Sequence, residues 1–245
     1  MGINRPGGLA RYTAPSGVAA RGANGSYTPS LAGADSNPYP NVIQGKSDLI
    51  TGNDIQLVNN WLSPTAINPG PPYDDSCLFW PGTWGNDVMM VGTVGIAAGQ
   101  SGTATFQELE FLFCCDVTPG CLRLYEMNIA VHPTAVYADI ARWNGGTNTN
   151  AACFDIAQHT TGFAAVANGN QFKALKVGTN LSSYLDTGSG FVQLGSTIDL
   201  TTFPANAYGP NTYINGLVGV GAWQRGGVSG DLTKFGWASV TILAP

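Results

Sequence analysis

The chain has 245 residues and is 44% hydrophobic, but only 10% of its residues are charged, against roughly 25% in an ordinary soluble domain. Its formal net charge of −5 argues against a general nucleic-acid binder, because such proteins need a basic surface. No apolar run approaches the roughly 18 residues of a membrane span, so we expect no membrane insertion.

Residues 1–45 have the composition of an extended arm, rich in Gly, Ala, Pro and Ser and without an apolar period. Arg5, Arg11 and Arg21 lie in this segment, whereas all fifteen acidic residues follow residue 34. A basic arm on an acidic body predicts that the arm docks on an acidic surface through these arginines. The alternative is a solvated tail. Residues 1–17 contain no apolar h-region, so we expect no secretory signal peptide.

Residues 46–76 are predicted to form a linker with one short helix. The helix is expected around 53–61, with Asn53 or Asp54 as its cap and Pro64 as its stop. From residue 77 to 245 the chain consists of strand patterns separated by turn signals, including a hairpin around 178–180. Such a pattern predicts an all-β, two-sheet antiparallel sandwich of jelly-roll type.

The five cysteines do not make a complete disulfide framework, because their number is odd. Cys115 and Cys121 flank the turn sequence "DVTPG", and in a hairpin they would lie opposite each other. We therefore predict that these two can form a disulfide where the compartment is oxidising. Paired C-x-x-C spacing is missing, which argues against a zinc site, and no Asp-rich ligand run indicates a calcium site. We therefore expect no metal and no cofactor.

The stretch "YADIARWNGG" at 137–146 alternates like a strand and ends in a turn signal. Tyr137, Asp139 and Trp143 share one face, and Arg142 lies on the other, where we expect it to pack or form an interface. A glycan site needs an aromatic platform with convergent polar groups. The candidates are Tyr125, Asn128, Tyr137, Asp139, Trp143 and Trp223, with Arg225 as a further polar group. The alternative is that these aromatics are ordinary strand residues.

From about residue 106 to 242 the order of elements resembles the concanavalin A-like, laminin-G-like jelly roll. The resemblance rests on "LYEMNIAV", "YADIARWNGG", "NQFKALKVGTNLSSYLDTGSGFVQLGSTID", "INGLVGVGAW" and "FGWASVTIL". It implies the sandwich fold. The family includes lectins, glycan-binding modules, glycoside hydrolases, polysaccharide lyases and structural adhesion domains, so the fold does not choose among these functions.

If the protein were an enzyme, Glu108 and Glu110 would be its catalytic residues, because alternation places both on one strand face. The hydrolase branch of the family typically carries Glu-x-Asp-x-x-Glu, and residues 108–113 lack the third carboxylate. We therefore expect no catalysis and interpret the pair as two solvated acids on a strand.

The sequence as a whole favours a non-enzymatic virion protein, such as a capsid decoration (cement) or tail component of a phage. Its arm would bind other virion proteins or further copies of the chain in an oligomer, and the sandwich could adhere to cell-surface glycans. Such a protein would assemble in the host cytoplasm and become extracellular when the particle is released. The alternatives are a carbohydrate-active hydrolase or lyase and a free lectin-like module.

Overall fold

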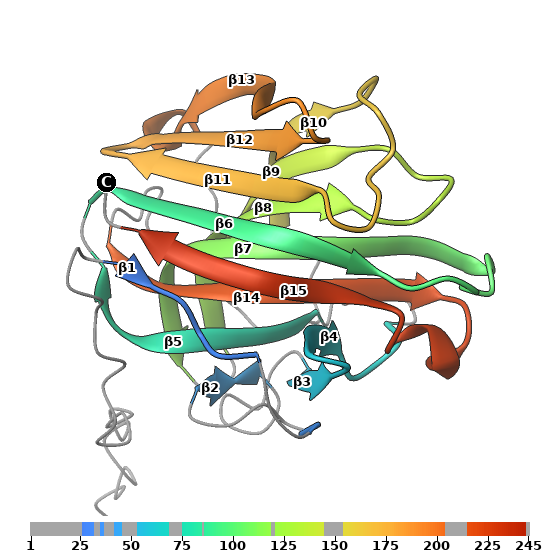
Figure 1. The fold of residues 1–245 in the computed structure, drawn as a ribbon. Helices are drawn as coiled ribbons and strands as arrows, with labels where there is room; N and C mark the ends of the chain where they lie inside the picture. The colour runs from blue at the N-terminus through green and yellow to red at the C-terminus, as the bar shows by residue number, and fades with distance from the viewer. Residues whose placement is uncertain are drawn as a thin grey trace, which may run out of the picture.

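The computed structural model describes residues 26–31, 35–36, 42–45, 53–68, 75–84, 86–118, 121–144, 154–203 and 215–243. These residues form two antiparallel β-sheets that pack face to face (Figure 1). The all-β, two-sheet jelly-roll sandwich predicted from the sequence is confirmed. In the described part of the chain, no helix combines the length and the apolar character needed to cross a membrane.

The first sheet has eight strands in the order β13-β12-β11-β6-β15-β4-β3, with β1 paired to β15. Their bounds are β1 (Ser26–Tyr27), β3 (Ile55–Val58), β4 (Trp61–Pro64), β6 (Val88–Ile96), β11 (Gln171–Val177), β12 (Asn180–Asp186), β13 (Val192–Asp199) and β15 (Phe235–Leu243). The hairpin expected around 178–180 is confirmed, because β11 and β12 pair antiparallel on either side of it.

The second sheet has seven strands in the order β10-β9-β8-β7-β14-β5-β2. Their bounds are β2 (Ile43–Gln44), β5 (Ser76–Trp84), β7 (Ala104–Thr118), β8 (Cys121–Ala130), β9 (Ala138–Asn144), β10 (Phe154–Thr160) and β14 (Gly216–Gly226). Two short 3₁₀ helices, η2 (Leu200–Thr202) and η3 (Ser229–Asp231), lie in the connections after β13 and β14.

Aromatic stacking across the two sheets holds the centre of the core. Phe111 of β7 stacks on Trp237 of β15, with ring centroids 4.4 Å apart, and on Phe172 of β11 at 5.6 Å. Gly92 of β6 makes this possible, because a Cβ atom there would lie 2.5 Å from the Trp237 ring. Because successive strand residues alternate between faces, the side chains between these buried residues point away from the core.

The helix predicted around 53–61 is wrong. Residues 55–58 and 61–64 form the hairpin β3–β4, whose strands join the eight-stranded sheet. Asn59 and Asn60 both have positive φ, at 54° and 61°, which is the requirement of a two-residue hairpin turn. Ile55 and Leu57 are buried and alternate with less buried residues, as expected for a strand. The sequence interpretation instead took Asn53 as the cap of a helix.

Strands β1 and β2 come from the segment predicted to be an arm, and each pairs with a strand of the sandwich. Arg5, Arg11 and Arg21 lie outside the described residues, as do residues 145–153, where the sequence predicts a turn.

The predicted Cys115–Cys121 disulfide is not formed, and both residues are free thiols. The pairing of β7 with β8 places Cys121 opposite Thr118, because the register of β7 shifts between Phe113 and Asp116. That irregularity, where Cys114 has a φ of 53°, moves Cys115 away from the position that the hairpin sequence suggested.

Candidate functional site

The outer face of the seven-stranded sheet, which points away from the core, carries a row of polar side chains. Cα pairing aligns His159 of β10, Asp139 of β9, Asn128 of β8, Glu110 of β7 and Gly221 of β14 across five neighbouring strands. On β9, β8 and β7 the polar residues Asp139, Asn128 and Glu110 each lie between two core residues, so alternation places their side chains on the outer face.

A cavity of about 420 Å³ opens on this outer face. It is lined by Asp75, Phe106, Glu108, Glu126, Asn128, Tyr137, Asp139, Trp143, Phe154, Ile156, His159, Trp223 and Arg225. Its volume lies in the range of small-molecule sites, roughly 300–1,000 Å³. The lining combines carboxylates, one amide and aromatic rings, which suits a ligand with both hydroxyl groups and an apolar surface.

Asn128 is the centre of a hydrogen-bond network in the cavity wall. Its Nδ2 donates to Oε2 of Glu108 at 2.9 Å and to Oε1 of Glu126 at 2.7 Å. Its Oδ1 accepts from the backbone N–H of Asp139 at 3.0 Å. The amide therefore fixes the two glutamates relative to each other and to β9.

The other oxygens of the two glutamates are also held. The Tyr137 hydroxyl donates to Oε1 of Glu108, and the Trp143 indole donates to Oε2 of Glu126 at 2.5 Å. Both donors are themselves cavity residues. Each carboxylate thus has both oxygens bonded to protein groups, and the aromatic rings are oriented by the same contacts.

Burial raises the pKa values of these carboxyl groups. The pKa of Glu108 lies well above its ordinary value because of burial and the repulsion of Glu126, against a smaller lowering by the Tyr137 hydrogen bond. Burial raises the pKa of Glu126 to about 7, although Trp143 and Asn128 stabilise its charged form. Burial also raises the pKa of Asp139. The cavity wall consequently retains protons at pH values where exposed carboxylates have lost them.

Aromatic rings stand on two sides of the carboxylates. Phe106 stacks on Trp223, with centroids 5.7 Å apart and planes at 18°, and the guanidinium of Arg225 lies 6.0 Å from the Phe106 centroid. On the other side Trp143 meets Phe154 edge-on at 4.8 Å. These pairs provide flat apolar walls beside hydrogen-bonding groups.

Five of the six predicted glycan residues meet in the cavity: Asn128, Tyr137, Asp139, Trp143 and Trp223. The prediction is wrong for the sixth residue, Tyr125, which does not line the cavity. It is fully buried in the core between the sheets, with its ring centroid 5.3 Å from that of Phe203. Arg225 joins the cavity lining, whereas Arg142 faces the core, as the strand alternation predicts.

The prediction that Glu108 and Glu110 are two solvated acids is wrong, because both side chains are buried on the outer face of the sheet. Glu108 lines the cavity, and Glu110 lies beside it in the row that reaches Gly221. A further carboxyl group, that of Glu126 on the neighbouring strand, lines the same cavity. Position in the sheet, rather than position on one strand, brings the acids together.

The sequence interpretation missed Asp75, Phe106, Glu126, Phe154, Ile156 and His159, which also line the cavity. Glu126 was detectable in principle, because alternation puts it on the same face of its strand as Asn128. His159 contacts Oδ1 of Asp139 through Nδ1 at 2.6 Å, from the paired position on β10. The contact between His159 and Asp139 depends on the pairing of β10 with β9, which the sequence of neither strand reveals.

No protein-family model and no curated protein matches the chain. Solved structures match over most of its length. A legume lectin-like domain from Entamoeba histolytica is 9% identical, covers 79% of this chain and 88% of its own, and has a TM-score of 0.50. The exoplasmic/lumenal domain of VIP36, in its Ca²⁺/Man-bound form, is 9% identical, covers 79% of this chain and 82% of its own, and has a TM-score of 0.51. This chain shares their lectin-type jelly-roll sandwich, and at such identity the likeness shows the fold alone.

Proposed function

We propose that the protein binds a glycan in the cavity on the outer face of its seven-stranded sheet. The observation that carries the proposal is the network in which Asn128 holds Glu108 and Glu126 between two aromatic walls. Sugar hydroxyls can donate to the remaining lone pairs of the carboxylates, and the C–H faces of a sugar ring can lie on the indoles. The fold shared with a legume lectin-like domain and with the Ca²⁺/Man-bound VIP36 domain supports the same proposal.

The charge of the cavity restricts the kind of glycan. The carboxyl groups of Asp75, Glu108, Glu126 and Asp139 line its wall, and Arg225 is the one lining side chain that always carries a positive charge. An acidic sugar would add negative charge to a wall in which carboxyl groups already repel one another, so the proposed ligand is a neutral or amino sugar.

A glycan array probed with the full chain tests this proposal. Hits with neutral or amino sugars are expected, and Trp223→Ala should weaken each hit at least about tenfold by removing one aromatic wall. Phe191→Ala is the matched control, because Phe191 is a partly exposed aromatic outside the cavity lining. An array without hits, or equal binding by the two variants, would contradict the proposal.

Glycoside hydrolysis is a second candidate, favoured by the spacing of Glu108 and Glu126. Two oxygens that accept from the same nitrogen lie about 5 Å apart, which is near the carboxyl separation of retaining glycosidases. Binding is proposed first because every oxygen of these two glutamates already accepts a protein hydrogen bond. Incubating the array hits with the protein decides: release of a reducing sugar that Glu108→Gln abolishes would favour the enzyme.

We further propose that the arm attaches the protein to a virus particle, where the sandwich would be displayed. The support is compositional, since Arg5, Arg11 and Arg21 precede every acidic residue of the chain. Because β1 pairs with β15, a truncation should end before Ser26 to leave the sheet intact. Deleting residues 1–25 should abolish co-sedimentation with particles while glycan binding persists, and normal co-sedimentation of the truncated protein would refute the attachment.

A further inference from the structure

Glu110 presents a buried carboxylate oxygen without a hydrogen-bond donor. Its side chain is only 1% exposed, and Oε1 accepts no hydrogen bond from any group in the described part of the chain. The other oxygen, Oε2, lies above Gly221, where a Cβ atom would be 1.9 Å away. A buried carboxylate oxygen without a partner is unfavourable, and a cation bound beside it would stabilise the ionised form of Glu110 in place of a proton.

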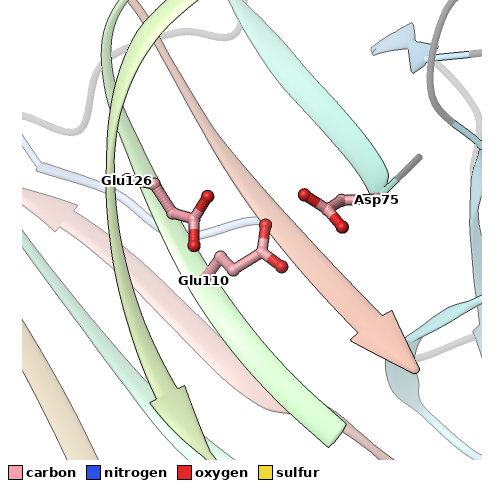
Figure 2. Close-up of side chains that lie close together, drawn as sticks. All are labelled: Asp75, Glu110 and Glu126. Carbon is pink, nitrogen blue, oxygen red and sulfur yellow. The ribbon is translucent and has the colours of Figure 1, made fainter. Parts of the chain in front are cut away.

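Two further carboxylates converge on Glu110. Asp75, which directly precedes β5, and Glu126 of β8 each offer an oxygen, and these oxygens and one of Glu110 all lie within 4.8 Å of one another. Figure 2 shows the Glu110 carboxylate extending between the other two, across the strand that separates β7 from β5. The missing side chain at Gly221 opens the path for this extension.

The charges around Glu110 do not neutralise it. Asp75, Glu126 and Glu108 are the carboxylates that act on it, and all three repel its charge. The basic side chains that line the cavity have other contacts: His159 bonds to Asp139, and the Arg225 guanidinium lies over Phe106. A cation between these three acids would relieve their mutual repulsion and contact the orphan oxygen of Glu110.

We propose that Asp75, Glu110 and Glu126 bind one divalent cation, with Ca²⁺ as the best fit. Oxygen-only ligands favour hard cations over zinc or copper. Oxygens that lie within 4.8 Å of one another can share one ion whose bonds to oxygen are about 2.3–2.6 Å long, as those of Ca²⁺ are. Ca²⁺ is preferred over Mg²⁺ because it accepts irregular oxygen geometry, whereas Mg²⁺ demands a near-ideal octahedron and keeps several of its waters.

The surroundings of the cluster suit a resident ion. Trp143 and Asn128 donate to the two oxygens of Glu126 and so orient this ligand from outside, as supporting residues do in metal sites. Asp75 and Glu126 also line the cavity, so the remaining coordination positions face its interior and can be filled by water. Cation binding is independent of the glycan proposal, because it needs no sugar in the cavity.

Calorimetric titration of the chelator-stripped full chain tests the site without any glycan. Ca²⁺ is expected to bind with a stoichiometry of one and to raise the melting temperature, with a weaker response to Mg²⁺. Glu110→Gln should reduce the affinity by at least about 100-fold, since loss of a supporting residue alone costs about 10–100-fold. Asp116→Asn is the control, because Asp116 is an exposed acid on the same strand and should leave the affinity unchanged.

Comparing the melting temperatures in chelator and in Ca²⁺ distinguishes loss of cation binding from a general folding defect, which would lower both. In chelator, Glu110→Gln should melt at or above the temperature of the wild type, because it removes a repelled charge, whereas in Ca²⁺ it should melt below it. Asp75→Asn, altered at a half-buried position, should lose Ca²⁺ binding without affecting the core. A folded wild-type protein that binds none of Ca²⁺, Mg²⁺ and Mn²⁺, or a Glu110→Gln variant with wild-type affinity, would overturn the proposal.

Discussion

Arg142 donates from Nη2 to Oδ2 of Asp155 at 2.7 Å, although the Arg142 side chain has no exposed surface. Arg142 lies on β9 and points into the sandwich, where its guanidinium is 4.9 Å from the Phe203 ring centroid. Asp155 is its Cα partner on the edge strand β10. The core thus contains a full charge whose carboxylate partner comes from the edge of the sheet.

Removing the Asp155 carboxylate should lower the free energy of unfolding more than replacing the Arg142 guanidinium that it neutralises. Asp155→Ala leaves the buried guanidinium without this partner, so the free energy of unfolding should fall by about 1.5–3 kcal/mol. Arg142→Met replaces the charge with an apolar chain of similar length and should cost less. Urea unfolding of the two variants measures the difference, and the reverse order would show that Asp155 contributes little.

Asn128→Asp should destabilise the outer face of the seven-stranded sheet. The substitution replaces the donor shared by Glu108 and Glu126 with a further acid, so like charges meet where two hydrogen bonds stood. We expect a loss of at least about 2 kcal/mol in the free energy of unfolding, together with loss of glycan binding. Thermal unfolding and the array measure both effects.

Asn180→Asp is the matched control for this charge change, because Asn180 is exposed and lies on the other sheet. It should leave both the melting temperature and the array hits unchanged. Similar losses in the two variants would mean that net charge, rather than the Asn128 network, sets the stability.

Alternation along single strands was enough to predict the fold and the two faces of β9. It correctly separated Asp139 and Trp143 from Arg142, because side chains change face at every strand residue. It failed at Asn59 and Asn60, where a two-residue turn with positive φ at both positions looks like a polar helix start. Asparagine is common both at helix caps and in hairpin turns, so these residues do not distinguish the two structures. The pairing of β4 with β15 shows that this segment is a hairpin.

The acidic cluster lay beyond single-strand reasoning, since its members come from different strands. Glu126 approaches Glu108 through the pairing of β7 with β8, and Asp75 approaches Glu110 across β14. In the sequence these residues are separated by 18 and 35 positions, with no recognisable ligand spacing. Register and the glycine at 221 create the cluster, and neither is encoded in a local motif.

Gly221→Ala should disturb the cluster directly. The added Cβ would lie 1.9 Å from Oε2 of Glu110, so the carboxylate must move away from Asp75. We expect a loss of about 1–3 kcal/mol from overpacking and a large decrease in Ca²⁺ affinity. Melting temperature and calorimetry measure the two effects.

Gly230→Ala provides the comparison, because a Cβ atom there meets nothing within 4 Å. This variant should retain the stability and the Ca²⁺ affinity of the wild type. If Gly221→Ala behaved in the same way, the close approach of Glu110 to β14 would not be needed for cation binding.

His132 supplies a pH dependence that is separate from the cavity. Its side chain is buried after β8, its Nδ1 lies 2.9 Å from the Thr134 hydroxyl, and its Nε2 has no hydrogen-bond partner among the described residues. Burial lowers the pKa of His132, and the nearby charge of Asp231 offsets this only in part. The folded protein therefore resists protonation of a ring that the unfolded chain protonates near pH 6.5.

Because the unfolded state takes up this proton first, the stability associated with neutral His132 is present above about pH 6.5 and declines as the pH falls below it. His132→Gln keeps a polar group but cannot titrate, so its free energy of unfolding should fall less between neutral and mildly acidic pH than that of the wild type. Urea unfolding at the two pH values gives the comparison, in which all other titrating groups cancel. Identical losses in both proteins would show that the His132 ring accepts a proton in the folded state as readily as in the unfolded chain.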